Sequence, residues 1–123
     1  MRITALHHVQ LAMPAGEEDA ARAFYQGLLG IPEVAKPPHL AVRGGAWFER
    51  QDLKVHLGVE REFSLASKAH PAFLVTGLAA LVVRLTEAGF VPAADEPLEG
   101  YERVYVNDPF GNRIELMARS GRI

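Results

Sequence analysis

The sequence predicts an α+β fold built from two βαβββ modules in a single domain, residues 1–123. Its 123 residues are enough for one ordinary domain with a hydrophobic core. Two stretches show the same order of features, since "HHVQLAMP…LLGIPEV" is followed later by "HPAFLVTG…EAGFVPA". In each stretch a strand-like run precedes an apolar pattern of helical period. The repeat places module 1 at about residues 1–60, a connector at 61–69 and module 2 at about 70–123.

The composition indicates a globular chain and excludes several kinds of site. Apolar residues make up 49% and charged residues 23%, which is typical of a folded domain. The formal net charge of −2 gives no reason to expect a nucleic acid or a membrane as partner. Cysteine is absent, so disulfides, thiol nucleophiles and thiolate metal ligands are excluded. No signal-peptide pattern or long apolar segment occurs, and we expect a cytoplasmic protein.

The first module is expected to start with a strand over residues 3–12. Acidic residues at 17–19 favour the start of a helix, where the helix dipole stabilises negative charge. Gly30, followed by Pro32, is expected to end this helix. The apolar positions recur at i, i+3, i+4 and i+7 and predict one buried face, made of Ala21, Phe24, Tyr25 and Leu28.

Three short strands are expected to complete the first module, at residues 40–43, 46–50 and 53–59. Gly44-Gly45 and Gln51-Asp52 have the composition of the turns between them. Trp47, in the second of these strands, can line the pocket or fill the core, and we expect it in the core.

The second module is expected to begin with a strand over residues 71–76. Thr76 is a candidate N-cap for the helix that follows, and Gly89 is expected to end that helix. Two further strands are predicted at 101–107 and 113–118, joined by a turn with Pro109 in second place. The helix is expected to bury one apolar face, made of Leu78, Leu81, Val82 and Leu85.

Polar side chains that can bind a metal recur at equivalent places in the two modules. "KVHL" and "RIEL" carry His56 and Glu115 in the third position, and His8 and His70 precede them at nearly equal spacing. Strand alternation puts His8, His56 and Glu115 on the polar faces of their strands. If a pseudo-twofold axis relates the modules, His8 meets His70 and His56 meets Glu115. Three imidazoles and one carboxylate suit Zn, Ni, Mn or Fe.

Three long motifs, "LHHVQLAMPAGEEDAARAFYQGLLGIPEV", "HPAFLVTG" and "VYVNDPFGNRIELM", resemble the vicinal oxygen chelate superfamily. This group contains glyoxalase I, bleomycin and fosfomycin resistance proteins and extradiol dioxygenases. The resemblance implies two βαβββ modules that form a cupped mixed sheet around a divalent metal ion. It assigns metal ligation to His8, His70 and Glu115. The fourth position, a glutamate in glyoxalase I, is His56, which can also be read as an outer group that orients a ligand, as a pocket acid or base, or as an outward-facing residue.

The resemblance implies a glyoxalase-like lyase or isomerase, or a dioxygenase, acting on a substrate that chelates through neighbouring oxygens. Glu115 and His56 are the implied catalytic residues. Arg103 and Tyr105 share one strand face and are expected to bind the substrate. The alternative is a bleomycin-resistance-like protein that binds a drug or metabolite without catalysis. Open sheet edges predict a homodimer, and the site can be built within one chain or across two.

Overall fold

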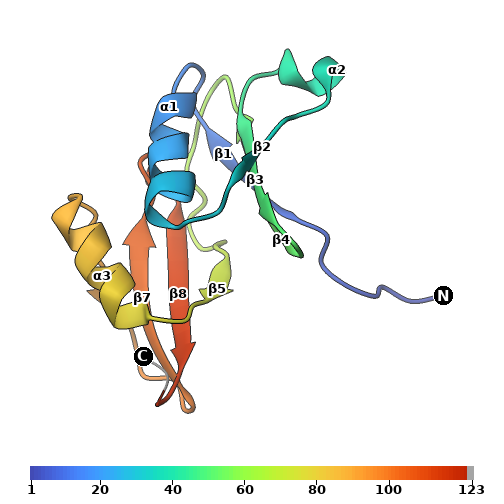
Figure 1. Ribbon diagram of the computed structural model, residues 1–123. Coiled ribbons are helices and arrows are strands. Elements are labelled where there is room, and N and C mark those ends of the chain that lie inside the picture. The colour runs from blue at the N-terminus through green and yellow to red at the C-terminus, as the bar shows by residue number, and fades with distance from the viewer. Residues whose placement is uncertain (122–123) are drawn as a thin grey trace. The chain divides into compact units, whose positions relative to one another are not determined.

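The computed structural model describes residues 1–121 and divides the chain into two compact units. Unit 1 is Met1–Ser64 and unit 2 begins at Leu65. Each unit contains one four-stranded mixed sheet and helical segments, as Figure 1 shows. The last two residues of the predicted second module, 122 and 123, lie outside the described residues.

In unit 1 the strands are ordered β1-β4-β3-β2. Strand β1 runs parallel to β4, whereas β3 is antiparallel to both β4 and β2. The helix after β1 starts as α-helix and continues with π-type turns. The elements are β1 (Val9–Met13), α1 (Glu18–Ala21), η1 (Arg22–Leu28), β2 (Glu33–Val34), α2 (Pro38–Ala41), β3 (Ala46–Arg50) and β4 (Leu53–Val59).

Unit 2 repeats this arrangement, with the order β5-β8-β7-β6. Strand β5 is parallel to β8, and β7 is antiparallel to both of its neighbours. The predicted α+β class with two βαβββ modules is therefore confirmed. The elements are β5 (Ala72–Leu74), α3 (Leu78–Glu87), β6 (Ala93–Ala94), β7 (Tyr101–Asn107) and β8 (Arg113–Arg119).

Each unit buries the apolar faces that the sequence predicts. In unit 1, Phe24 and Tyr25 of η1 are fully buried, and the Tyr25 ring stacks on Phe48 of β3 at 5.5 Å. In unit 2, Leu85 of α3 is buried, as is Ile114 of β8. Burial of these side chains on one face of each sheet leaves the other face to the polar residues.

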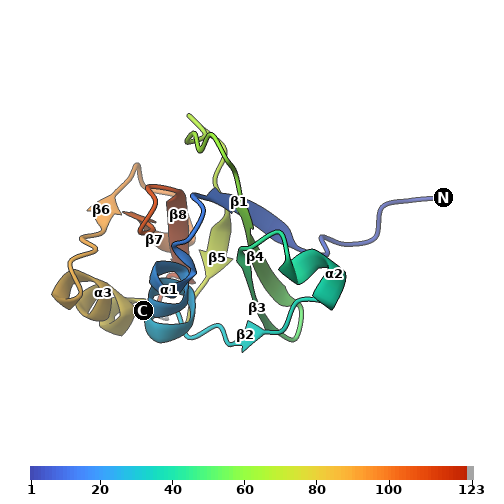
Figure 2. The same ribbon diagram turned by 90° about the horizontal axis from the view of Figure 1, so that it is seen from above.

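The N-terminal strand is shorter than predicted. Residues 1–8 are outside any strand and exposed, and Figures 1 and 2 show them extending away from the rest of unit 1. The reason is that a strand needs a hydrogen-bonded neighbour. The partner strand β4 starts only at Leu53, after the turn at Gln51-Asp52, and Val55 is the first of its residues that pairs with β1.

The predicted strand at residues 40–43 is wrong. A short helix, α2, occupies this region, with Pro38 in its first turn and the Leu40 amide donating to the Pro37 carbonyl at 2.9 Å. Proline has its φ angle locked near the helical value and needs no amide partner, so it favours a helix start. The edge position of the sheet is taken instead by β2, which the sequence pattern did not indicate.

Two details of unit 2 also differ from the prediction. Gly77, not Thr76, precedes α3, and its φ of 75° lies in the left-handed region where glycine is favoured. No side-chain hydrogen bond caps this helix. The loop before β7 contains the two-residue strand β6, which is too short to show a periodic pattern.

The predicted turn between β7 and β8 is confirmed. The Gly111 amide donates to the Asp108 carbonyl at 3.1 Å, which closes the turn. The buried Asp108 carboxylate accepts from the backbone amides of Phe110 and Asn112 at 2.9 and 2.8 Å. This turn sets the register of β8 and thereby the face on which Glu115 lies.

None of the helices in the described residues is long and apolar enough to span a lipid bilayer.

Candidate functional site

The side chains predicted to bind a metal, called donors below, lie at matching places in the two units: His56 and Glu115 within β4 and β8, and His8 and His70 just before β1 and β5. In unit 1, Val9 pairs with Val55, so His8 stands beside Lys54, two residues before His56. In unit 2, Ala72 pairs with Glu115, so His70 stands beside Arg113, two residues before Glu115. The repeat seen in the sequence is therefore also a repeat of strand register.

In unit 2, His70 and Glu115 lie in direct contact. The His70 Nε2 atom is 3.0 Å from Glu115 Oε1, and its Nδ1 atom is 2.9 Å from the Lys68 carbonyl. A carbonyl only accepts hydrogen bonds, so Nδ1 carries a proton. In the neutral ring Nε2 then presents a lone pair to the carboxylate. Two electron-rich atoms this close need a cation at that point, either a proton on Nε2 or a metal ion.

Glu115 is buried, with its side chain 7% exposed, and is surrounded by donors. Its second oxygen, Oε2, accepts from Arg103 Nη1 at 3.2 Å. Burial raises the pKa of Glu115, but the hydrogen bonds from His70 and Arg103 outweigh it, so that the pKa lies below its ordinary value. The carboxylate is therefore ionised at neutral pH, as a metal ligand must be.

Arg103 uses all three guanidinium nitrogens within unit 2. Its Nε and Nη2 atoms donate to the Glu96 carbonyl at 3.1 and 2.8 Å. Nη2 also lies 3.1 Å from the Asp95 carboxylate, and Nη1 reaches Glu115. The side chain is 18% exposed. Sequence reasoning identified Arg103 but not Asp95 or Glu96, because their loop lacks any periodic pattern.

Tyr105 stands opposite Glu115 on the neighbouring strand. Its ring lies edge-on to His70 at 5.2 Å, and the Arg113 guanidinium lies over it at 4.8 Å. Burial, a hydrogen bond with Asp95 and the charge of Glu115 all raise the pKa of Tyr105. The phenol therefore keeps its proton and can donate a hydrogen bond.

In unit 1, His56 is buried and tightly held. Its Nε2 atom lies 2.6 Å from Glu49 Oε2. The Trp47 ring stacks on the imidazole at 4.1 Å and 6°, and the His8 ring stacks on it at 4.4 Å and 22°. Since β4 lies between β3 and β1, these rings flank His56 from two sides. The expectation that Trp47 fills the core is wrong, because it lies on the polar face with His56.

The surroundings of His56 favour a neutral ring. Burial lowers the pKa of His56, and the hydrogen bond with Glu49 offsets this only in part. A neutral ring that donates its Nε2 proton to Glu49 keeps Nδ1 as its lone-pair atom. His56 can therefore bind a metal, or accept a proton, through Nδ1.

Among the described residues of either unit, no group of three or more histidines, aspartates or glutamates is gathered so as to hold a metal ion. The structure instead brings the predicted donors together in pairs. His8 lies with His56 in unit 1, and His70 lies with Glu115 in unit 2. The neighbouring His7 is exposed, and its Nδ1 atom is 3.0 Å from Nδ1 of His8.

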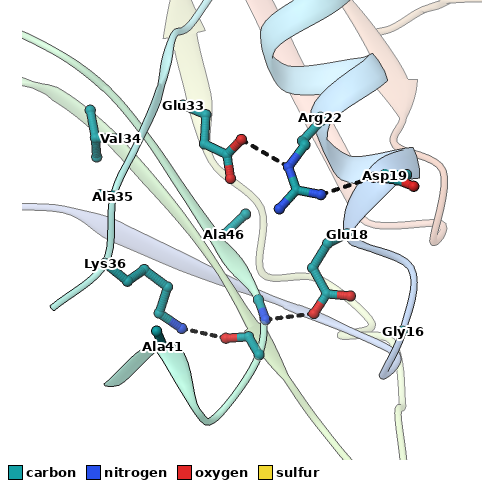
Figure 3. A pocket seen from close by; sticks show the side chains of 12 residues that line it. Gly16, Glu18, Asp19, Arg22, Glu33, Val34, Ala35, Lys36, Ala41 and Ala46 are labelled. Carbon is teal, nitrogen blue, oxygen red and sulfur yellow. Dashed lines mark hydrogen bonds and ion pairs between the residues drawn. The ribbon is translucent and has the colours of Figure 1, made fainter. Parts of the chain in front are cut away.

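Unit 1 also contains a cavity of about 480 Å³ between the start of the helix and the β2 edge, shown in Figure 3. Arg22 reaches between Asp19 and Glu33, to which it donates at 2.9 and 2.8 Å. Glu18 accepts from the Gly45 amide at 2.9 Å, and Lys36 donates to the Gly44 carbonyl. These charges are paired with protein groups and fix the Gly44-Gly45 turn to the helix. None of the predicted donors lines this cavity.

The duplicated mixed sheets, each with the same strand order and the same parallel and antiparallel pairings, define a class of two-module α+β proteins. A family comparison agrees with this class. Residues 5–116 match the model of the Glyoxalase/Bleomycin resistance protein/Dioxygenase superfamily, and the chain belongs to this family. Among curated proteins, none matches the sequence.

Solved structures with the same fold cover almost the whole chain. A protein from Bacillus anthracis assigned to the glyoxalase family is 43% identical, with a TM-score of 0.91 over 98% of this chain and 100% of that one. A glyoxalase/dioxygenase from Nostoc punctiforme is 25% identical, with a TM-score of 0.76 over 94% and 90%. The fosfomycin resistance protein FosX from Listeria monocytogenes, at 18% identity and a TM-score of 0.76 over 98% and 97%, shares the fold.

Proposed function

We propose that this protein is a divalent-metal-dependent enzyme with lyase or isomerase chemistry on a substrate that binds through two neighbouring oxygens. One observation carries the proposal. The His70 Nε2 atom lies 3.0 Å from Oε1 of the buried Glu115 carboxylate, and the Lys68 carbonyl holds the imidazole through Nδ1, so that two side chains able to bind a metal face one another. Membership of the Glyoxalase/Bleomycin resistance protein/Dioxygenase superfamily supports it.

We propose that four side chains bind one ion of Zn, Ni, Mn or Fe. The ligands are His8 and His56 of unit 1 and His70 and Glu115 of unit 2. Imidazole and carboxylate ligands suit these ions, and the chain has no thiolate to favour a softer one. The site is completed within one chain or across a homodimer. Strands β1 and β5 are edge strands of their own sheets, and open edges favour the formation of a homodimer.

When bound, the ion supplies Lewis acidity to the substrate oxygens and stabilises negative charge as it develops on them. The chain's own residues have separate tasks. Tyr105 keeps its phenolic proton, and the hydrogen bond it makes with Asp95 can be exchanged for one to a substrate oxygen. The neutral His56 ring presents its Nδ1 lone pair for ligation while Glu49 holds its Nε2 proton. The buried Glu115 carboxylate is held ionised by Arg103, so that it is ready to bind the cation.

Metal content of the purified protein, followed by a metal-binding titration, tests the proposal. We expect about one tightly bound divalent ion per chain or per completed site, and its loss in the His70→Ala/Glu115→Ala double variant. His39→Ala is the matched control, because His39 is exposed in α2. The metal-loaded protein is then assayed against hemithioacetals, epoxides and catechols. A protein that binds no divalent metal and instead binds an aromatic cation would be a sequestering protein, and the enzyme proposal would fail.

A further inference from the structure

A continuous chain of polar contacts runs through the donor pair of unit 2. It begins at the Asp95 carboxylate, 3.1 Å from Arg103, and continues from Arg103 to Glu115 at 3.2 Å. From Glu115 it passes to His70 at 3.0 Å and ends at the Lys68 carbonyl at 2.9 Å. Both outer ends of the chain are fixed to protein groups, so the two donors in its middle have little freedom to turn.

Arg103 and His70 contact different oxygens of the Glu115 carboxylate. Arg103 Nη1 takes Oε2, which leaves Oε1 facing Nε2 of His70. Strand register explains the reach, since Arg103 is paired with Met117, one diagonal step from Glu115. The opposite side of the guanidinium is held by Asp95 and by the Glu96 carbonyl.

We propose that Arg103 is a positioning residue for Glu115, and that Asp95 and the Glu96 carbonyl hold Arg103 in place for this task. The inference rests on the proposed function in that Glu115 binds a divalent ion through Oε1. A planar guanidinium spans the Glu96 carbonyl and the Glu115 carboxylate at the same time, because its donors form a rigid fork. A lysine ammonium is a single point charge and cannot reproduce both contacts.

The same contacts argue against Arg103 as a group that is free to bind substrate. Its three nitrogens are engaged by Asp95, Glu96 and Glu115, and its side chain is mostly buried. On the same face of β8, Arg113 is exposed, with its guanidinium over the Tyr105 ring, and is therefore a cation that remains accessible.

The experiment measures Co²⁺ binding to the metal-free full chain by calorimetry, together with the visible absorption spectrum of the Co²⁺-loaded protein. The variants are Arg103→Met, Arg103→Lys and Asp95→Asn. Arg61→Met is the matched control, because Arg61 is an exposed arginine in the connector. Circular dichroism and thermal unfolding check that each variant is folded.

We expect Arg103→Met to weaken Co²⁺ binding about 10- to 100-fold, the usual effect of removing a group that orients a ligand. Arg103→Lys should restore only part of this loss, and Asp95→Asn should weaken binding several-fold. The Co²⁺ spectrum should change in Arg103→Met and stay unchanged in Arg61→Met. If Arg103→Met does not fold, the Co²⁺ affinity of Asp95→Asn tests the inference instead, because this variant keeps the arginine and removes only the carboxylate that holds it.

Two results would overturn the inference while leaving the proposed function standing. In the first, both Arg103→Met and Asp95→Asn have the same Co²⁺ affinity and the same Co²⁺ absorption spectrum as the unchanged protein. The other is tighter binding in Arg103→Met, because it would mean that the arginine competes with the metal. Failure of the unchanged protein to bind Co²⁺, Zn²⁺ or Ni²⁺ at all would instead remove the proposed function, and this inference with it.

Discussion

The two units have the same fold, but the side chain that is placed to bind a metal is a neutral imidazole in one unit and a carboxylate in the other. In unit 1 the buried donor is an imidazole, His56, and the group that holds it is the carboxylate of Glu49. In unit 2 the buried donor is a carboxylate, Glu115, and the group that holds it is the guanidinium of Arg103. The fold therefore determines the strand position of the side chain that is placed to bind a metal, and the neighbouring strand supplies the residue that hydrogen-bonds it.

These partners do not occupy equivalent positions. Glu49 is paired with Lys54, two residues before His56, whereas Arg103 is paired with Met117, two residues after Glu115. The position in unit 2 that corresponds to Glu49 is Asn107, which is paired with Arg113. The partner of each donor is therefore specific to its own module and is not part of the repeat.

The aromatic neighbours, in contrast, do occupy equivalent positions. Trp47 is paired with His56, and Tyr105 is paired with Glu115. Trp47 stacks flat on an imidazole, which is a planar ring, whereas Tyr105 presents a hydroxyl beside a carboxylate and stands edge-on to His70. The same place in the sheet therefore carries an aromatic side chain suited to its donor.

The largest effect is expected from removing a donor of unit 2. Glu115→Ala should weaken divalent metal binding more than about 100-fold, because it removes the proposed anionic ligand itself and not only a group that orients it. His56→Ala, its counterpart in unit 1, should cost less, since a neutral ligand is lost. Calorimetric titration with Zn²⁺ compares the two variants. Equal losses would show that the two modules contribute alike.

The two cores should respond alike to truncation. Leu57 of β4 and Leu116 of β8 are both buried and occupy equivalent places, next to His56 and Glu115. Each change to alanine should lower the free energy of unfolding by about 2–5 kcal/mol, because it leaves a cavity in a packed core. Chemical denaturation measures both. A loss below about 1 kcal/mol in one variant alone would show that its unit is less tightly packed than the other.

The two hairpin turns should respond in opposite directions. Asp108→Ala should lower the free energy of unfolding by about 1–3 kcal/mol, since half-buried amides of the turn before β8 lose their buried acceptor. Gln51, in the corresponding turn before β4, has a φ of 55°, which strains a side-chain-bearing residue. Gln51→Gly should therefore raise the stability, by at most about 1 kcal/mol. Thermal unfolding of the two variants tests the contrast, and destabilisation by Gln51→Gly would contradict it.

The smallest effect is expected at the partner of His56. Glu49→Gln keeps an oxygen that can accept the Nε2 proton but removes the charge. Metal affinity should fall by about 10-fold or less. Arg50→Gln is a suitable control on the same strand, because Arg50 is exposed and donates to the Gly30 carbonyl. An unchanged affinity in Glu49→Gln would mean that the charge of Glu49 does not influence His56.

The sequence by itself determined the fold class and the faces of the main elements. The alternation in β4 and β8 and the helical spacing of Phe24, Tyr25 and Leu85 are local properties, and each reports which side of an element is buried. The repeat likewise placed His8, His56, His70 and Glu115 at equivalent positions before any coordinates were known, because strand period is a property of consecutive residues.

Only the tertiary structure decided which groups hold these donors. Glu49, Asp95 and the Glu96 carbonyl reach the donors through strand register and the path of a loop, neither of which leaves a periodic pattern in the sequence. Trp47 was expected in the core because its size and apolar ring suit burial, yet the register places it over His56. Side-chain type is encoded residue by residue, whereas contact across strands depends on how distant segments pair, and that is settled only when the chain folds.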